Sequence, residues 1–327
     1  MLANLLQRSS TQASAEAAGS GPRIALFLEE ESGDWHVRRL EVAMRRRGAS
    51  VVVTSLPRCA FDTKAPSGID IPGFNGTLPD AVFVRSISAG TLEQITFRLG
   101  LLHALRESGV RVWNDARAIE RCVDKSMTTF LLNKAGIATP RTRTVEGHAP
   151  AVAYVQEAGR PLIFKPLFGS QGKGLLKMDT LADLPAPEAA DNIYYLQDYV
   201  PPSGATFEAD AFEDWRVIVT RYRVVAAMGR RAGTWITNVH QGGAPVPCVP
   251  TREMEELASA ALAAVDADYA GVDLIRAPDG RLLVLEVNSN PSWRGLQSVS
   301  DIDVADAVVE DFLAGMRAQQ SLARCVP

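Results

Sequence analysis

The sequence predicts an α/β protein whose later lobes are of the α+β type. In the first third of the chain, short apolar runs typical of buried strands alternate with segments whose apolar residues recur at helical spacing. This alternation predicts a mostly parallel sheet with helices on its faces. Further along the chain, strands predominate and are separated by turns rich in glycine and proline. A length of 327 residues fits two or three packed units.

The first expected unit, residues 22–118, follows a mobile leader at residues 1–21. Its strands are expected at residues 23–28, 50–54, 80–85 and 110–113, and its helices at residues 35–47 and 91–108. A glycine follows each helix, Gly48 and Gly109, because glycine readily adopts the left-handed conformation that ends many helices.

Two lobes are expected after this unit, a central lobe at residues 119–204 and a C-terminal lobe at residues 205–317, with a tail at residues 318–327. The central lobe is expected to hold a helix at 124–135 and strands at 161–167, 174–178 and 194–200. The C-terminal lobe is expected to hold strands at 216–220, 224–231, 271–276 and 281–288, and helices at 252–265 and 303–317. The segment Pro201-Pro202-Ser203-Gly204 separates the lobes, because proline and glycine interrupt regular structure.

The composition excludes several classes of protein. A net charge of −4 and a hydrophobic fraction of 46% are ordinary for a soluble globular protein, and they give no global nucleic-acid footprint. No apolar run approaches the roughly 20 residues that a membrane span needs. The four cysteines are scattered without a C-x-x-C pair, which argues against structural zinc and favours a reducing, cytoplasmic setting.

Three oxygen-bearing side chains of the last expected hairpin indicate a metal site. In a strand, residues two apart face the same side, so Glu286 and Asn288 project together. The Pro-Asp-Gly turn predicts a hairpin, and a two-residue loop would place Asp273 opposite position 284, on that same face, whereas a bulge at Gly280 would reverse the parity. Two carboxylates and an amide form a site of the kind that Mg²⁺ prefers. The alternative is a solvated polar face of an edge hairpin, but the apolar surroundings favour the metal site.

A glycine-rich turn indicates a phosphate-binding flap. The segment Gly169-Ser170-Gln171-Gly172-Lys173-Gly174 lies between two expected strands, which differs from the strand–loop–helix order of a Walker A motif. Glycine lets a backbone approach phosphates closely, and Lys165 reaches from the strand beneath. The alternative is an ordinary flexible hairpin.

Other polar residues are weak signals when each is taken alone. Lys125 stands at a helix start, and Gln197-Asp198-Tyr199-Val200 ends a strand whose backbone groups could bind an adenine edge. Arg216 and Arg230 suit bidentate binding of a carboxylate or phosphate. The alternatives are a surface lysine, an ordinary strand end and surface ion pairs. No G-x-S-x-G serine or catalytic triad supports a hydrolase.

Taken together and in this order, the motifs resemble those of the ATP-grasp superfamily, and more narrowly those of the RimK-type α-L-glutamate ligases. The resemblance spans about residues 80–316. Its strongest segments are DKSMTTFLLNKAGIATP, FKPLFGSQGKG, QDYV, DWRVIV, RRAGTWITNVHQGG and AGVDLIR…LLVLEVNSNP. Several such segments in the right order are far more specific than any one of them.

This resemblance implies an N-terminal pre-ATP-grasp α/β domain and an ATP-grasp fold with ATP between the two later lobes. It implies that Lys125 and Lys165 contact phosphates. For the mechanism, we expect Arg216 and Arg230 to hold the acyl phosphate or a glutamate carboxylate. The remaining nucleotide contacts would be Gly169, Ser170, Gln171, Gly172, Gly174, Gln197, Asp198, Tyr199, Val200, Asp214, Ile236, Thr237 and Asn238. The metal ligands would be Asp273, Glu286 and Asn288. Two positions depart from the family: Ile236 stands where arginine is frequent, and Asp198 replaces a commoner glutamate.

The implied reaction joins a carboxylate to an amine through an acyl phosphate, with ATP and Mg²⁺, or alternatively Mn²⁺, as cofactors. Residues 84–114, VRSISAGTLEQITFRLGLLHALRESGVRVWN, look like the branch that adds L-glutamate to tetrahydromethanopterin-type pterins. The acceptor would then be a carboxylate-bearing small molecule, with no nucleic acid or membrane as partner and with self-association left open. The alternatives are a glutamate ligase acting on a protein tail or another small molecule, a kinase, and a non-catalytic nucleotide-binding regulator.

Overall fold

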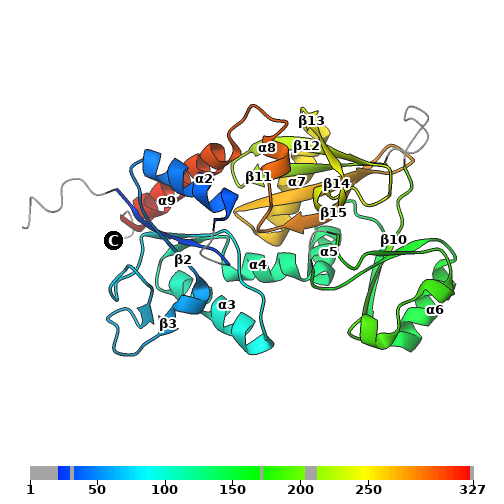
Figure 1. Ribbon diagram of the computed structural model, residues 1–327, viewed down its shortest axis with the longest axis horizontal. Helices are drawn as coiled ribbons and strands as arrows, with labels where there is room; N and C mark the ends of the chain where they lie inside the picture. The colour runs from blue at the N-terminus through cyan, green and yellow to red at the C-terminus, as the bar shows by residue number, and fades with distance from the viewer. Residues whose placement is uncertain (1–20, 30–32, 170–171, 203–211, 325–327) are drawn as a thin grey trace, which may run out of the picture. The chain divides into compact units, whose positions relative to one another are not determined.

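The computed structural model describes residues 21–29, 33–169, 172–202 and 212–324. The chain forms two compact units, one comprising Met1–Val112 with Phe312–Pro327 and the other Trp113–Asp311 (Figure 1). The expected leader up to residue 20, Ser170, Gln171 and the second half of the Pro201–Gly204 break lie outside the described residues. The boundaries between the expected central and C-terminal lobes therefore stay predictions.

The first unit contains the expected alternation of strands and helices. Its sheet has the order β2-β1-β5-β6, and β1 pairs in parallel with both β2 and β5. The elements are β1 (Arg23–Phe27), α2 (Trp35–Arg46), β2 (Ser50–Thr54), β5 (Ala81–Val84), α3 (Leu92–Glu107) and β6 (Arg111–Trp113). Each predicted element is confirmed to within a few residues. The unit also holds a part of α9 (Val304–Arg324), from Phe312 onward, and the ring of Phe312 packs edge-on against Phe83.

Very short elements of this unit leave no trace in the periodicity of the sequence. Between β2 and β5 lie the 3-10 helix η1 (Leu56–Arg58) and the two-residue strands β3 (Ala60–Phe61) and β4 (Ile69–Asp70), which pair with each other. Two residues are too few to show an alternating pattern, so the sequence carries no signal for them.

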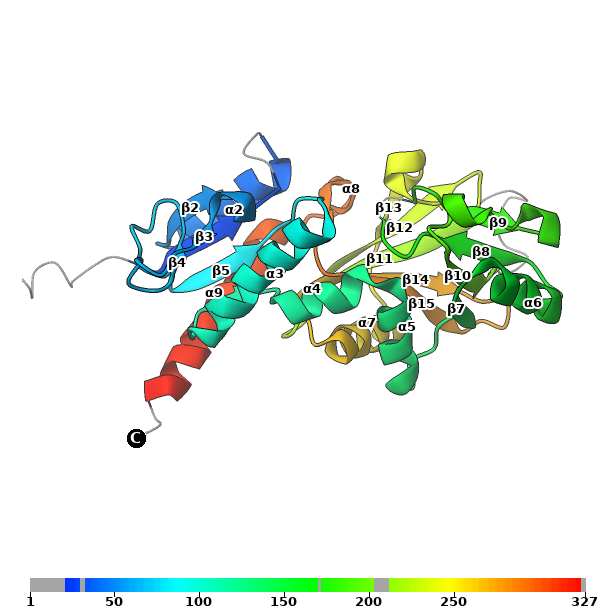
Figure 2. The ribbon, with the colours of Figure 1, turned by 90° about the horizontal axis from the view of Figure 1, so that it is seen from below.

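The second unit contains two antiparallel sheets, of which the smaller has the order β7-β10-β8-β9. Its strands are β7 (Thr142–Glu146), β8 (Leu162–Lys165), β9 (Leu176–Met178) and β10 (Ile193–Asp198). Helix α6 (His148–Ala158) covers one face, where Tyr154 packs with Phe164 and Tyr194 (Figure 2). Neither β7 nor α6 was predicted; α6 begins at Gly147, which offers no side-chain cap.

The larger sheet has the order β13-β12-β11-β14-β15. Its strands are β11 (Phe212–Thr220), β12 (Val224–Ala232), β13 (Ala244–Cys248), β14 (Tyr269–Arg276) and β15 (Leu282–Asn288). Strand β13 was not predicted because it contains Pro245 and Pro247; prolines are tolerated there because β13 lies at the sheet edge.

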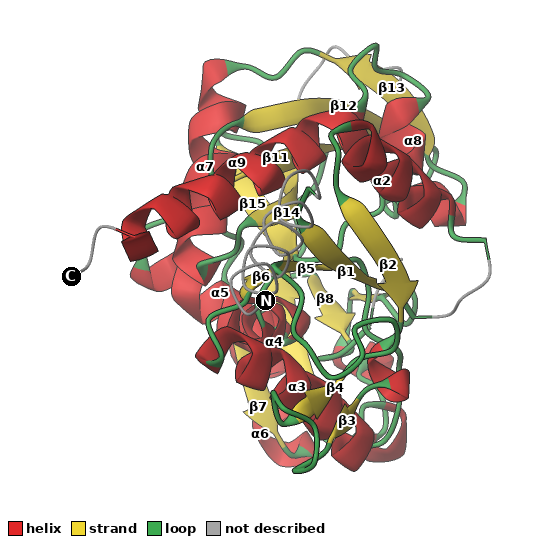
Figure 3. Ribbon diagram, turned by 90° about the vertical axis from the view of Figure 1, so that its left-hand side faces the viewer, coloured by secondary structure: helices red, strands yellow, loops and turns green. Residues whose placement is uncertain are grey.

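Three helices cover one face of this larger sheet, and several charged residues lie on the other face. Helix α7 (Arg252–Val265) packs against β11, β14 and β15, with α4 (Ala116–Val123) and α5 (Lys125–Lys134) nearby (Figure 3). Val217, Val272 and Val284 point into this core. Because side chains alternate along a strand, Arg216 and Asp273 lie on the opposite face. The alternation therefore separates a hydrophobic core from a charged surface.

The remaining helical segments are short. They are η2 (Leu181–Asp183), η3 (Pro187–Ala189), η4 (Val239–Gln241) and α8 (Arg294–Gln297). Within the described part of the chain, no helix has both the length and the apolar character that crossing a bilayer would require.

Candidate functional site

A cleft with an open volume of about 870 Å³ lies within the second unit. Both sheets line it. Lys165 and Gln197 come from the smaller sheet, whereas Asp273 and Glu286 come from the charged face of the larger sheet. The cleft gathers all the sequence-predicted nucleotide and metal residues that are described, except Gly174 and Asn288, which do not line it.

The register of the β14–β15 hairpin differs from the expected one. Asp273 lies opposite Glu286, not opposite position 284. Two shifts cause the difference: Arg276 pairs with Leu282, so the connection is longer than two residues, and a bulge follows Asp273. Each shift alone would move Asp273 to the wrong face, and together they restore it to the face of Glu286.

The bulge also brings a residue into the cleft that the sequence pattern did not indicate. The ladder passes from the pair Leu274–Val284 to the pair Asp273–Glu286, so Leu285 has no partner of its own. Leu285 and Glu286 both line the cleft, although consecutive strand residues ordinarily face opposite sides. The hairpin thus presents an apolar surface beside an acidic one.

Four charged side chains form a buried network across three neighbouring strands. Arg216 donates to Asp273 through Nε and Nη2, at 2.8 and 2.7 Å. Arg230 donates to Asp214 through the same two atoms, at 2.6 and 2.5 Å, and its Nη2 lies 3.2 Å from Asp273 Oδ2. Strand register explains the pairing, because Arg216 is opposite Asp273 and Asp214 is opposite Arg230.

The network favours the charged forms of Arg230 and Asp273. Burial acts to lower the pKa of Arg230, but the carboxylates of Asp214 and Asp273 outweigh it and raise that pKa above its usual value. Burial acts to raise the pKa of Asp273, and Arg216 and Arg230 lower it below the usual range. Arg230 is only 3% exposed, and it lines the cleft together with Asp214 and Asp273.

Two lysines approach the acidic side of the cleft. Lys165 projects from the end of β8, where burial lowers its pKa to about 8 although Glu286 acts in the opposite direction. Lys125 is the first residue of α5, whose N-cap Asp124 accepts from the backbone of Ser126 and Met127. Burial lowers the pKa of Lys125 as well. Two ammonium groups near one carboxylate form a site suited to an anionic ligand.

The glycine-rich turn borders the cleft opposite a loop of the larger sheet. Gly169 and Gly172 line it, and Gly172 has a φ of +71°. A Cβ on Gly172 would lie 2.7 Å from Asn238 Oδ1 and 3.0 Å from Gln241 Nε2. The positive φ favours glycine, and a larger residue would displace the side-chain ends of Asn238 and Gln241, so Gly172 lies close to the segment that contains Asn238.

Two polar residues at the end of β10 have different partners. Gln197 is buried, and its Nε2 donates to Tyr195 Oη and Thr142 Oγ1, each at 3.1 Å. The carboxylate of Asp198 pairs with Arg160 at 3.0 Å. This ion pair uses Oδ2, whereas the buried Oδ1 of Asp198 has no hydrogen-bond partner among the described residues.

Several apolar lining residues were missed by sequence reasoning. Strand residues of this kind are indistinguishable from core residues in a periodic pattern. Trp235 is a different case, because a tryptophan beside the predicted Ile236, Thr237 and Asn238 was a usable signal. The missed apolar lining residues are Ile163, Pro166, Leu175, Trp235, Ile275 and Leu285.

The oxygen donors of the hairpin suit a hard divalent cation. Asn288 lies opposite Gly271, two positions from the Asp273–Glu286 pair, and its Nδ2 donates to Gly271 O at 3.4 Å, which leaves Oδ1 as an acceptor. Among the described residues, no group of three or more His, Cys, Asp or Glu side chains is placed to hold a metal. The set here is two carboxylates and one amide, and Mg²⁺ usually completes so small a set with phosphates and water. Asp273 and Glu286 therefore fit a metal that binds in the cleft together with a phosphate ligand, and Asn288 follows Glu286 on β15 without lining the cleft.

Comparisons with known proteins agree with this geometry. The family described as the RimK-like ATP-grasp domain matches residues 122–312. The tetrahydromethanopterin:alpha-L-glutamate ligase of Methanococcus maripaludis is 31% identical over 299 residues, covering 89% of this chain and 98% of that protein. A probable alpha-L-glutamate ligase of Thioalkalivibrio sulfidiphilus is 31% identical, covering 91% of this chain and 98% of that protein.

Solved structures show the same fold at low identity. The ATP-grasp ligase PsnB, complexed with a minimal precursor, Mg and ADP, superimposes with a TM-score of 0.68 at 20% identity, covering 90% of this chain and 98% of PsnB. A RimK domain ATP-grasp protein of Sphaerobacter thermophilus gives a TM-score of 0.62 at 20% identity, covering 89% of this chain and 99% of that protein.

Proposed function

Because the chain belongs to the RimK-like ATP-grasp family and is a ligase of that family, we propose that it adds L-glutamate to a carboxylate of a tetrahydromethanopterin-type pterin. The observation that carries the ligase chemistry is the cleft in which Lys125 and Lys165 face the acidic pair Asp273 and Glu286. The pterin acceptor is supported by the named Methanococcus maripaludis relative, because that likeness extends well beyond residues 122–312.

The chain's own residues suit each part of ATP. Leu285 and Ile163 offer apolar surfaces for the adenine ring beside Tyr199 and Val200. Lys125 and Lys165 lie where ammonium groups can neutralise phosphate charge. Mg²⁺, held by Asp273, Glu286 and Asn288, would supply further neutralisation of the β- and γ-phosphates when bound.

The proposed reaction proceeds in two balanced steps. A carboxylate oxygen of the acceptor attacks the γ-phosphorus of ATP, and the bond from that phosphorus to the bridging oxygen breaks to release ADP. The amine of L-glutamate then attacks the acyl carbon, its nitrogen loses a proton to solvent, and inorganic phosphate leaves with the electron pair of the broken C–O bond. Most of the acceleration comes from positioning and charge neutralisation.

The two arginines have different proposed parts. Arg216 binds Asp273 through Nε and Nη2, so within the described residues its Nη1 stays available for an acyl phosphate or a glutamate carboxylate. Arg230 engages Asp214 and Asp273 and orients them. The turn at Gly172, resting on Asn238, shields the acyl phosphate from water, since such intermediates hydrolyse readily.

An ADP-release screen with L-glutamate tests this proposal. Candidate acceptors are a tetrahydromethanopterin-type pterin, a deazaflavin cofactor, an amino-group carrier and a peptide that copies an acidic protein tail. We expect ADP release with the pterin and a product heavier by one or more glutamyl residues. If the peptide were glutamylated and the pterin were not, the acceptor would be a protein tail instead of a pterin. A phosphorylated product without an amide would indicate a kinase, and no ADP release would indicate a regulator.

A further inference from the structure

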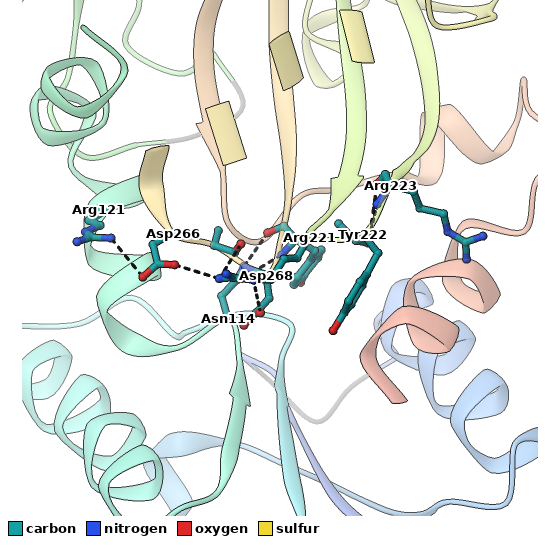
Figure 4. Close-up of polar contacts among 10 residues, drawn as sticks. Asn114, Arg121, Arg221, Tyr222, Arg223, Asp266 and Asp268 are labelled. Carbon is teal, nitrogen blue, oxygen red and sulfur yellow. Dashed lines mark hydrogen bonds and ion pairs between the residues drawn. The ribbon is translucent and has the colours of Figure 1, made fainter. Parts of the chain in front are cut away.

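The side chain of Asn114 lies completely buried where β14 and β15 separate. It directly follows β6 in sequence but contacts residues more than 150 positions away. Figure 4 shows it beside Asp268, among the polar contacts at this end of the larger sheet. The ligase mechanism above makes no use of it.

The amide of Asn114 forms four hydrogen bonds, all to backbone groups. Its Nδ2 donates to Tyr269 O at 2.8 Å and to Ser289 O at 2.7 Å. Its Oδ1 accepts from Asp268 N at 2.7 Å and from Tyr269 N at 3.1 Å. Both donors and both acceptor positions of the side chain are therefore used, which no other side chain of similar size can reproduce.

These four bonds continue the ladder beyond its last backbone pair. The final pair of β14 and β15 is Gly271 with Asn288. Past it, Nδ2 of Asn114 links Tyr269, at the start of β14, to Ser289, which directly follows β15. A side chain thus bridges the two strands at the point where their backbones no longer pair.

The bridge adjoins a proposed metal ligand on β15 and lies one strand segment away from another on β14. Ser289 is the neighbour of Asn288, and Tyr269 precedes Asp273 by four residues on the same strand. The ring of Trp113 stacks on Tyr269 at 5.8 Å, with planes 18° apart, which further fixes this end of β14. The amide of Asn114 therefore links the ends of the two ligand-bearing strands directly.

We propose that Asn114 is a positioning residue that sets the spacing of Asp273, Glu286 and Asn288 for a divalent cation by joining the ends of β14 and β15. This inference rests on the proposed function, because it takes those three residues as the ligands. Asn114 touches no ligand atom itself. It acts through the backbone of Tyr269 and Ser289, much as outer contacts orient the ligands of other metal sites.

The variant Asn114→Asp tests the bridge with little change in size. It removes both Nδ2 donors and leaves Tyr269 O and Ser289 O without them. Binding of Mn²⁺ to the ADP complex is measured by electron paramagnetic resonance, and binding of ADP alone is measured by calorimetry with chelator present. We expect Mn²⁺ affinity to fall about tenfold, as for other outer-shell changes, while ADP affinity without metal stays within twofold.

Thr220→Val serves as a matched control. Like Asn114, Thr220 is buried and its side chain makes several hydrogen bonds. Its hydroxyl donates to Asp311 Oδ2 at 2.7 Å and accepts from the backbone nitrogens of Tyr222 and Arg223. Its partners do not lie on β15. We expect this control to lower thermal stability without weakening Mn²⁺ binding, which separates positioning from a general loss of stability.

The outcomes are distinct. If the wild-type protein binds Mn²⁺ and ADP, two results would overturn the positioning role. One is an unchanged Mn²⁺ affinity in Asn114→Asp, and the other is an equal loss of Mn²⁺ affinity in Thr220→Val. Absence of Mn²⁺ binding in the wild-type ADP complex would overturn both this inference and the metal assignment of the proposed function. If Asn114→Asp does not fold, Asn114→Ser, which keeps a hydroxyl at the position, takes the same measurements with the same expected result.

Discussion

The ammonium group of Lys125 donates to the carbonyl oxygen of Gly169 at 2.9 Å and to that of Leu167 at 3.3 Å. The first residue of α5 therefore holds the start of the glycine-rich turn, in addition to lying near the proposed phosphate site. With the proposed phosphate contact, Lys125 would link nucleotide binding to the position of the turn.

Replacement of Lys125 by methionine is expected to raise the KM for ATP about tenfold, because a charge-assisted hydrogen bond contributes about 1.5–3 kcal/mol. The turnover number should fall less than the KM rises, since Lys165 remains. Steady-state ADP release measures both. Lys134→Met, on the exposed last turn of the same helix, is the control and should leave the KM unchanged. An unaltered KM in Lys125→Met would remove the phosphate role.

Replacement of Gly172 by alanine is expected to slow amide formation about tenfold and to increase the share of ATP hydrolysed without product. The φ of +71° costs an alanine about 1–3 kcal/mol, and the added carbon would meet Asn238. Parallel measurement of ADP and glutamylated product gives the ratio. Gly233→Ala is the control, because no atom lies within 4 Å of the place that its Cβ would take and its φ is ordinary for other residues. An equal ratio of glutamylated product to ADP in both variants would show that the turn does not shield the acyl phosphate.

The acidic face of the last hairpin was predictable from sequence, but its register was not. An apolar run interrupted by Glu286 and Asn288 indicates one polar face whatever the pairing. The pairing of Asp273 depends on the length of the connection and on the bulge after it, and both are set by three-dimensional packing. The predicted face is correct because two shifts cancel.

The sequence motifs likewise could not predict which way single side chains point or which partners they bind. The QDYV segment predicts a strand end beside a ligand, but pairing of the Asp198 carboxylate with Arg160 depends on a residue 38 positions earlier in the sequence. Burial of Arg230 between two carboxylates has the same origin, because cross-strand partners cannot be read from spacing. Asn114 carries no sequence signal at all, since its partners are backbone groups.

Replacement of Glu286 by glutamine is expected to leave the fold intact and to remove most of the ligase turnover. The side chain keeps its size but loses the charge that balances Lys125 and Lys165. Outer contacts of metal sites already contribute about 10- to 100-fold, so a ligand should contribute at least as much. Thermal unfolding and ADP release are compared with Glu253→Gln, on the exposed start of α7. Near-normal turnover in Glu286→Gln at ordinary Mg²⁺ would contradict its metal role.

Affinity for ATP without metal is expected to decrease as the pH rises through about 8, the pKa of Lys165. Burial lowers this pKa, so the lysine of the free protein loses its proton in that range, whereas bound phosphate favours the charged form. Calorimetry across this range gives the dependence. Lys165→Arg should bind ATP with no inflection near that pH, because arginine stays protonated. The same inflection in both proteins would assign the titration to another group.

The buried network should respond differently to the loss of one partner and the loss of two. Arg230→Met leaves Asp214 and Asp273 with too few donors in a buried setting, so unfolding in urea should show a loss of about 3–5 kcal/mol. The double variant Arg230→Met with Asp214→Asn removes one of the stranded charges and should recover part of that loss, although Arg216 alone then supports Asp273. Additive losses in the double variant would mean that the two side chains contribute independently. In that case the pairing of Arg230 with Asp214 would not orient Asp273 beside Glu286.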